Sequence, residues 1–180
     1  KAKNCSTHID GARIFNASVA TNTPLRRMTR DYDSVSICLS KGLGAPVGSV
    51  LVGSEEFIGQ AHRWRKMFGG GMRQSGILAA AGMYALENNI QRLQDDHRRA
   101  QSIARAIDEM DHVSVDVDAV QTNMVYFSAN GFTASEVSQK MAKAGIDMFD
   151  ISPTHCRIVT HLHITDQDVE RVIDALSTLS

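Results

Sequence analysis

The sequence predicts an α/β protein with a second, smaller α+β domain. In residues 4–89, short β-like runs alternate with helical patterns, an order typical of an α/β layer with a parallel or mixed sheet. From about residue 113, strands and single helices follow one another in a way that favours helices on one face of a small antiparallel sheet. A long amphipathic helix over residues 89–110 joins the two zones. We therefore divide the chain into residues 1–98 and residues 99–180.

Three apolar runs and two helical patterns define the first domain. The predicted strands cover residues 6–10, 34–39 and 49–52. Ser54 and the two glutamates after it are typical of a capped helix start, and this helix runs toward Met67, just before three consecutive glycines. The segment QSGILAAAGMYAL, residues 74–86, is nearly all apolar or small, so we expect a fully buried helix.

The second domain is built from shorter elements. After the helix over residues 89–110, whose apolar side chains recur at spacings of three and four, the chain alternates apolar runs with amphipathic segments. The predicted strands cover residues 113–117, 123–128, 146–149 and 156–161, and the predicted helices cover residues 134–144 and 166–179.

The composition argues against several kinds of partner and location. A net charge of −1 gives no electrostatic reason to expect nucleic acid or an anionic membrane. No apolar run reaches the length of a membrane span. The three cysteines are too few and too scattered for a disulfide framework or a zinc site, which favours a reducing compartment. The chain begins at Lys1 without a signal-peptide pattern, so we expect a cytoplasmic protein whose true beginning is not included.

A lysine between two apolar runs is the first candidate for chemistry. Lys41 follows the predicted strand over residues 34–39 and precedes GLGAPVGS, in which glycines allow close approach of a ligand. An unpaired buried ammonium costs several kcal/mol or gives up its proton. Lys41 is therefore either a nucleophile or an edge lysine that discourages strand aggregation. The lysine precedes the glycines, the reverse of a Walker loop, so nucleoside triphosphate binding is not supported.

Two further segments carry charge where a ligand could bind. In HIDGARIFNA, Asp10 lies at a strand end and Arg13 follows three residues later, an arrangement that also fits a helix-capping aspartate paired with a surface arginine. In RWRKMFGGGMRQSG, a glycine run before a helix lies among cations that include Lys66 and Arg73. This second segment is either an anion site or a flexible loop with solvated cations.

Near the C-terminus, the segment CRIVTHLHIT places Arg157 at the start of a strand. His161 and His163 share a face of that strand at a period of two, which makes a metal pair conceivable. No nearby residue completes a ligand set, so we expect structural roles for both histidines and no metal.

Four segments occur in a fixed order across nearly the whole chain: HIDGARIFNA, DSVSICLSKGLGAPVGSVLVGS, RWRKMFGGGMRQSGILAAAGMYAL and RIVTHL. As an ordered set, they resemble the low-specificity L-threonine aldolases, pyridoxal-phosphate (PLP) enzymes of the beta-eliminating lyase group with the aspartate-aminotransferase-like fold, fold type I. The resemblance implies that residues 1–98 are the second half of a PLP-binding large domain and that residues 99–180 are a small C-terminal domain. The resemblance further implies that the N-terminal part of such a protein is missing from this sequence.

The resemblance also implies roles for the charged residues. Lys41 would form a Schiff base with PLP, Asp10 would lie beside the pyridine nitrogen, and Arg13 would lie beside the phenolic oxygen. Arg157 would clamp the substrate carboxylate, a bidentate task that suits its planar fork. Lys66 and Arg73 would reach the cofactor phosphate from a neighbouring subunit, which implies a homo-oligomer, a dimer or tetramer, together with an N-terminal portion of the same protein.

The implied reaction is retro-aldol cleavage of L-threonine or L-allo-threonine to glycine and acetaldehyde, or of related β-hydroxy-α-amino acids to glycine and another aldehyde. No residue is assigned as the base for the β-hydroxyl group. His8 is the only histidine near the proposed pocket in sequence, and we expect it to be a packed core residue. Two alternatives stay open: a PLP-dependent β-elimination lyase of the same superfamily, and a catalytically incomplete fragment that needs an N-terminal partner.

Overall fold

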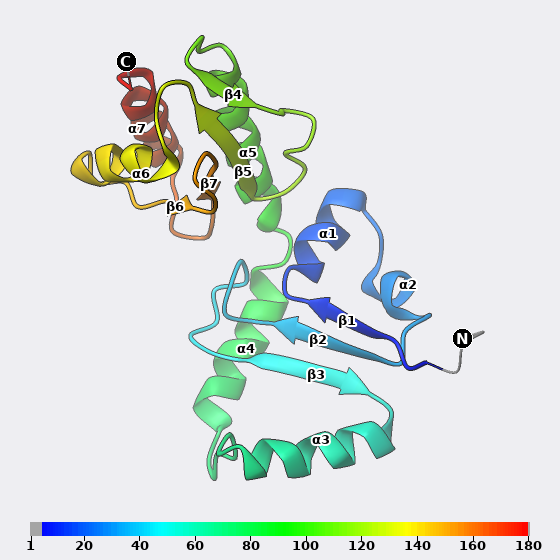
Figure 1. The fold of residues 1–180 in the computed structure, drawn as a ribbon. Helices are drawn as coiled ribbons and strands as arrows, with labels where there is room; N and C mark the ends of the chain where they lie inside the picture. Colours follow the sequence, from blue (N-terminus) through cyan, green and yellow to red (C-terminus); the bar gives the residue numbers. More distant parts are fainter. Residues whose placement is uncertain (1–4, 180) are drawn as a thin grey trace. The chain divides into compact units, whose positions relative to one another are not determined.

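The computed structural model of the chain describes residues 5–179 and divides into two compact units, Lys1–Arg92 and Leu93–Ser180 (Figure 1). Asn4, the first residue of the predicted first zone, lies outside the described residues. Over residues 5–179, no helix combines the length and apolar character needed to cross a membrane. The two units are described in turn.

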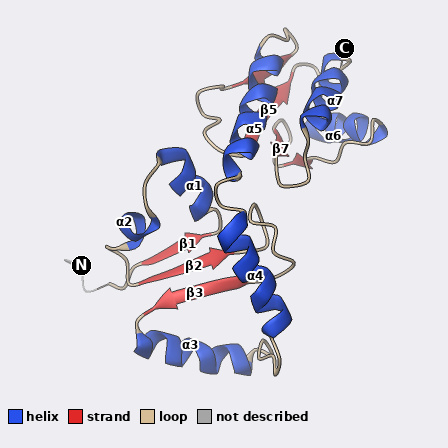
Figure 2. Cartoon of the chain, turned by 180° about the vertical axis from the view of Figure 1, so that it is seen from behind, coloured by secondary structure: helices blue, strands red, loops and turns tan. Residues whose placement is uncertain are grey.

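A three-stranded sheet forms the centre of the first unit. Its strands are β1 (His8–Gly11), β2 (Ser34–Cys38) and β3 (Ser49–Gly53), in the order β1-β2-β3. β1 and β2 are parallel, whereas β3 runs antiparallel to β2 (Figure 2). All three predicted strands are confirmed, with ends that differ by one or two residues.

Four helices accompany this sheet. They are α1 (Ile14–Thr21), α2 (Leu25–Thr29), α3 (Glu55–Met67) and α4 (Gly76–Asn88). The predicted start of α3 is confirmed, because the Ser54 side chain accepts a hydrogen bond from the backbone N–H of Phe57 at 3.3 Å. α4 crosses one face of the sheet, and Gly82 of α4 lies against the side chain of Leu39.

The predicted burial of α4 is wrong for this chain, and β3 is exposed as well. Only Gly82 and Ala85 of α4 are buried, and all five residues of β3 are exposed. The sequence correctly showed that these segments are apolar, but burial also requires a covering surface. In the part of the chain that the structure describes, nothing covers the outer side of α4, and β3 pairs only with β2.

The second unit is a four-stranded sheet covered on one face by helices. The strands are β4 (Val113–Val115), β5 (Met124–Ala129), β7 (Cys156–Val159) and β6 (Phe149–Asp150), all antiparallel and in the order β4-β5-β7-β6. The helices are α5 (Leu93–Asp108), α6 (Ala134–Lys143) and α7 (Asp166–Ser177). Both α6 and α7 begin with a threonine capping box.

The alternation of side chains along the strands separates a helix-covered face from an open face. Val125 and Phe127 of β5, together with Cys156 and Ile158 of β7, are buried in one core with side chains of α5, α6 and α7. Residues between them point the other way, because successive side chains of a strand lie on opposite faces. The predicted α+β unit with helices on one face of an antiparallel sheet is therefore confirmed.

Some element boundaries in this unit differ from prediction. The helix predicted over residues 89–110 begins only at Leu93, because α4 ends at Asn88 and residues 89–92 form a turn. The predicted domain division fell after residue 98, within α5. The whole of α5 instead packs against β4, β5 and α7, so the second unit begins at Leu93. The strand predicted over residues 146–149 is shorter and begins at Phe149.

Candidate active site

Parallel pairing of β1 and β2 brings two of the predicted site residues to one edge of the sheet. Asp10 pairs in register with Ser36, and Lys41 follows three residues after the last residue of β2, Cys38. The carboxyl ends of parallel strands lie at the same edge of a sheet, where α/β proteins commonly bind ligands. Arg13 lies at the same edge, because it is the residue that begins α1 directly after β1.

Asp10 is exposed, and its local turn is held by one hydrogen bond. The backbone N–H of Ala12 donates to Oδ1 of Asp10 at 3.2 Å. Gly11 allows β1 to approach β2 closely, because a Cβ at this position would lie 2.5 Å from the carbonyl oxygen of Ser36. Arg13 makes no ion pair with Asp10 within residues 5–179, so the alternative of a surface Asp–Arg pair is wrong.

Lys41 lies in an ordered loop between β2 and β3. The backbone carbonyl of Lys41 accepts from the N–H of Gly44 at 2.9 Å, and the backbone of Leu39 bonds both to Gly48 and to Ala45 at 3.0 Å. Leu39 and Ala45 are buried, as is Leu43 between them, and they anchor the loop while Lys41 itself is exposed. The loop therefore fixes the backbone that carries the amine.

The environment of Lys41 excludes one of its two interpretations. Lys41 is not part of a strand, and β2 is the central strand of its sheet, so the interpretation as a lysine on an edge strand is wrong. The ammonium group makes no ion pair in the described part of the chain. The side chain is exposed, so the desolvation expected for a nucleophilic lysine is not provided by residues 5–179.

Cys38 lies beside this loop and has a perturbed thiol. Partial burial on its own raises the pKa of Cys38, but hydrogen bonds with Ser40 and Ser49 and the positive charge of Lys41 outweigh burial and lower that pKa below its ordinary value. In the second unit, burial raises the pKa of Cys156 instead. The thiolate is the reactive form of cysteine, so these opposite shifts predict different reactivities.

We expect iodoacetamide near pH 8 to alkylate Cys38 well before Cys156 in the folded protein. Cys38 has the larger thiolate fraction and is partly exposed, whereas Cys156 is fully buried. A time course read by peptide mass spectrometry measures both rates, with the exposed Cys5 as an internal reference. Equal rates at Cys38 and Cys156 under conditions that preserve the fold would contradict the expectation.

The glycine run lies at the end of α3 rather than directly at the start of α4. The N–H groups of Gly69 and Gly70 bond to the carbonyls of Lys66 and Arg65, so these glycines close the C-terminal end of α3. Gly69 has a φ of +80°, the left-handed conformation typical of a helix C-terminus. The negative end of the α3 dipole therefore faces this run, so binding of an anion here depends on the side-chain cations of Lys66 and Arg73 rather than on a helix end.

Lys66 and Arg73 lie on either side of this glycine run, and both are exposed. The stem of Lys66 passes over Gly71, where an added Cβ would lie 2.9 Å from Cδ of the lysine. α3 packs along β3 and runs in the opposite direction to it. Because β3 is antiparallel to β2, the last turn of α3 lies toward the edge of the sheet at which β2 ends (Figures 1 and 2).

Arg157 lies in the second unit, on the open face of its sheet. It is half-buried, and its Nε atom is buried without a hydrogen-bond partner. No acidic side chain pairs with it among residues 5–179. A cation in such a setting is energetically suited to an anionic ligand, because the guanidinium carries several donors and no acceptor.

Other histidines of interest have local partners. His8 is exposed and hydrogen-bonds Ser34 through Nδ1 at 2.8 Å, so the expectation of a packed core residue is wrong. His161 and His163 lie after β7, with ring centroids 5.7 Å apart and the rings at 87°. Within the described residues, no group of three or more His, Cys, Asp or Glu side chains is placed to hold a metal.

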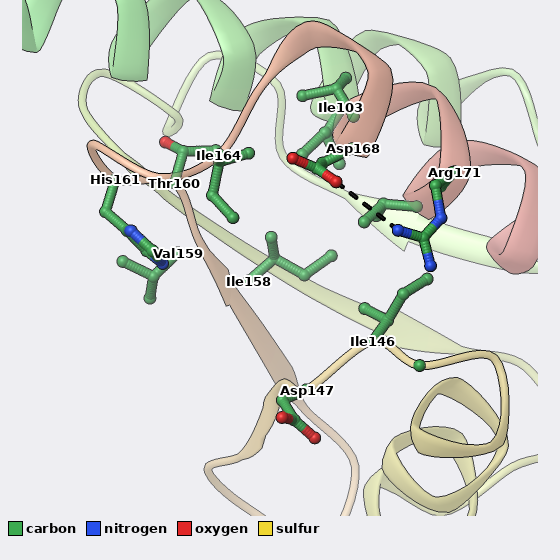
Figure 3. Close-up of a pocket in the computed structure, with 13 residues that line it drawn as sticks. Ile103, Ile146, Asp147, Ile158, Val159, Thr160, His161, Ile164, Asp168 and Arg171 are labelled. Carbon is green, nitrogen blue, oxygen red and sulfur yellow. Dashed lines mark ion pairs between the residues drawn. The ribbon is translucent and has the colours of Figure 1, made fainter.

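A cavity of about 240 Å³ lies on the helix-covered side of the second unit (Figure 3). Ile146, Ile158 and Ile164 line its interior, and Asp168 and Arg171, whose charged atoms are 3.6 Å apart, lie beside it. None of the six residues predicted for the active site lines this cavity.

Solved structures share the fold of this chain. A putative L-allo-threonine aldolase from Listeria monocytogenes EGD-E matches with a TM-score of 0.80 and 22% sequence identity, over 98% of this chain and 52% of that chain. The cystine C–S lyase C-DES matches with a TM-score of 0.65 and 16% identity, over 90% and 50% of the two chains. The chain thus has the α/β fold of these aldolase and lyase structures, over about half of their length.

Sequence comparison identifies the family. The family model for beta-eliminating lyases matches residues 1–130, so the chain belongs to the beta-eliminating lyase family. It is 48% identical over 172 residues to the low specificity L-threonine aldolase of Escherichia coli (strain K12) and 46% identical over 175 residues to the probable low-specificity L-threonine aldolase 2 of Arabidopsis thaliana. These alignments cover 96% of this chain, but the chain spans only about half the length of the curated relatives, 50% and 49%. The predicted resemblance to the low-specificity L-threonine aldolases is confirmed.

Proposed function

We propose that the protein containing this chain cleaves β-hydroxy-α-amino acids such as L-threonine and L-allo-threonine to glycine and an aldehyde, with PLP as cofactor. The observation that carries the proposal is the parallel pairing of β1 and β2, which brings Asp10, Arg13 and Lys41 to one edge of the sheet, where Lys41 has no ion pair among residues 5–179. The similarity to L-threonine aldolases supports the choice of reaction. Residues of Lys1–Arg92 would then belong to the PLP-binding domain and those of Leu93–Ser180 to the small domain.

The donor set at this edge fits PLP. An amine, a carboxylate and a guanidinium are the groups needed to attach an aldehyde, balance a protonated ring nitrogen and stabilise a phenolate. Lys66 and Arg73 add two exposed cations at the end of α3 and in the loop after it, suited to a phosphate. PLP, when bound, supplies an aldehyde for covalent attachment and a ring that accepts the electron pair released at Cα.

The residues of this chain have separate tasks in the proposed reaction. Lys41 must lose its proton to act as a nucleophile, and it holds the cofactor until the amino group of the substrate replaces it. The carboxylate of Asp10 would favour a proton on the ring nitrogen of the cofactor. Arg157 binds the substrate carboxylate through its fork. The Cα–Cβ bond breaks as the β-hydroxyl group gives up its proton, the aldehyde leaves, and Cα takes up a proton to give glycine.

Product analysis tests the proposal. The purified protein, supplied with PLP, is expected to convert L-threonine into equal amounts of glycine and acetaldehyde. β-Elimination is the second candidate, because the family and the C-DES structure are those of lyases that include β-eliminating enzymes. Pyruvate and ammonia from L-cysteine, without glycine from threonine, would replace the aldolase proposal with this one.

A shared cofactor site implies a second copy of the chain, and the first unit has a surface that would suit one. Apolar side chains around the end of α3 and the start of α4 are widely exposed, and Phe68 and Ile77 are 81% and 89% accessible to solvent. Trp64 stacks on Phe68 with ring centroids 5.8 Å apart. Clustered apolar exposure of this kind marks an interface. Native mass spectrometry should show a dimer or tetramer, and a monomer at micromolar concentration would contradict it.

Replacing Arg157 is expected to weaken binding of the amino-acid substrate. Arg157→Met removes the charge-assisted hydrogen bonds between the guanidinium fork and the substrate carboxylate. We therefore expect KM to rise roughly ten- to a hundredfold. Arg157→Lys keeps the charge but not the fork, so its KM should lie between that of the wild type and that of Arg157→Met. Steady-state kinetics measures both, and trapping with borohydride should show unchanged attachment of the cofactor to Lys41. Loss of cofactor attachment in either variant would contradict the assignment.

A further inference from the structure

The open face of the second sheet holds one arginine between two aromatic side chains from neighbouring strands. Arg157 of β7 pairs in register with Tyr126 of β5 on one side and with Phe149 of β6 on the other. Residues paired in this way lie on the same face, so all three side chains are on the side away from the helices. Tyr126 and Phe149 are 44% and 59% exposed.

Of these two aromatic side chains, Phe149 makes a ring contact with the arginine. The guanidinium carbon of Arg157 lies 5.1 Å from the centroid of the Phe149 ring, within the range of a cation–π interaction. The Tyr126 hydroxyl lies 3.6 Å from the sulfur of Met124 instead. Of the two flanking aromatic residues, Phe149 therefore contacts the cation through its ring, whereas the hydroxyl of Tyr126 contacts Met124.

This ring contact is the one interaction that orients the charged end of Arg157 in the described residues. The Nε atom has no hydrogen-bond partner, and no carboxylate pairs with the guanidinium. An arginine side chain loses rotamer entropy when a ligand fixes it. A ring beside the guanidinium limits its orientations before the ligand arrives, and so reduces that cost.

We propose that Phe149 is a positioning residue for recognition of the substrate α-carboxylate, and that it acts through Arg157. This inference rests on the proposed function, in which Arg157 binds that carboxylate. Phe149 is largely exposed on a strand of only two residues, so its ring contributes little to the core of the unit. The guanidinium of Arg157 lies over the ring of Phe149, which leaves its N–H fork free to bind a planar carboxylate in a bidentate manner.

The test compares KM with kcat for paired variants of the holoenzyme. Phe149→Leu keeps an apolar side chain but removes the ring, and it is expected to raise KM for L-threonine about two- to fivefold, with kcat little changed. Phe149→Tyr and Phe149→Trp keep a ring face and should restore the wild-type KM. Tyr126→Leu is the matched control, because it removes an exposed aromatic from the other side of the same arginine, and its KM should not change.

A double-mutant cycle separates positioning from a general effect on the sheet. In an Arg157→Met background, Phe149→Leu should have no further effect on KM, because the residue through which it acts is gone. Thermal unfolding of Phe149→Leu and Tyr126→Leu should match the wild type, since both side chains are exposed. Borohydride trapping at Lys41 should also be unchanged.

The outcomes distinguish this inference from the proposed function. If Arg157→Met raises KM and Phe149→Leu does not, the positioning role of Phe149 is overturned while the carboxylate site stands. Equal rises in KM for Phe149→Leu and Tyr126→Leu, or an undiminished effect of Phe149→Leu in the Arg157→Met background, also overturn it. If Arg157→Met leaves KM unchanged, the carboxylate site itself fails.

Discussion

Replacing Lys41 with alanine is expected to abolish turnover while the fold of the first unit stays intact. The loop that carries Lys41 is held by buried Leu39, Leu43 and Ala45 and by backbone hydrogen bonds, and the lysine side chain is exposed. Its removal should therefore change the free energy of unfolding by no more than about 0.5 kcal/mol. Loss of a covalent nucleophile should lower kcat by at least about a thousandfold.

Two measurements decide this prediction. Glycine formation from L-threonine reports turnover, and mass spectrometry after borohydride reduction with PLP reports whether the cofactor is attached to the chain. Lys143→Ala is a suitable control, because Lys143 is an exposed lysine at the end of α6 in the other unit. Wild-type turnover in Lys41→Ala, or an adduct on another lysine, would remove Lys41 from the proposed mechanism.

Replacing Asp10 with asparagine is expected to cause the second largest loss of activity. The amide oxygen can still accept the hydrogen bond from the N–H of Ala12, so the turn after β1 should persist while the negative charge disappears. Without that charge, the proton on the cofactor ring is no longer stabilised, and kcat should fall by about 10²- to 10³-fold, the size of loss typical of a preorganised electrostatic group.

The Asp10→Asn variant needs a comparison in which charge is kept and geometry changes. Asp10→Glu serves this purpose, and it should lose less activity than Asp10→Asn if charge is the important property. Borohydride trapping at Lys41 should still succeed in both variants, because the attaching amine is untouched. A kcat for Asp10→Asn close to that of the wild type would show that the carboxylate does not face the reacting ring.

Local patterns in the sequence were sufficient for most of the fold. Ser54 was recognised as a helix cap from its position before two acidic residues, and the structure shows its hydrogen bond to Phe57. The order of strands and helices after residue 113 correctly predicted a small antiparallel sheet with helices on one face. These features depend on neighbours within a few residues, which a single sequence displays directly.

Burial could not be predicted in the same way, because it depends on what covers a surface. The apolar composition of α4 suggested a fully buried helix, yet Ile77 is exposed, since nothing in the described residues packs on that side. The position of the glycine run was also ambiguous in the sequence, because a glycine run between two helices can either precede the second helix or end the first one. The φ of Gly69 and its bond to Lys66 show that the run closes α3.

The candidate site was predictable in part. The strand-end positions of Asp10 and Lys41, combined with parallel pairing, are enough to bring them to one edge. The contact of Phe149 with Arg157 was missed, because it depends on the register between β6 and β7. A strand of two residues carries no periodic signal from which that register could be read.

The exposed outer edge of β3 makes the isolated polypeptide prone to self-association. Val50, Leu51 and Val52 form a short ribbon of β-branched and aliphatic residues whose backbone groups on one side are paired to β2, while the other side meets no strand in the described part of the chain. Ribbons of this kind recruit further copies into intermolecular sheets. The soluble fraction of the isolated chain should thus fall steeply as its concentration rises, and Leu51→Lys should raise that fraction.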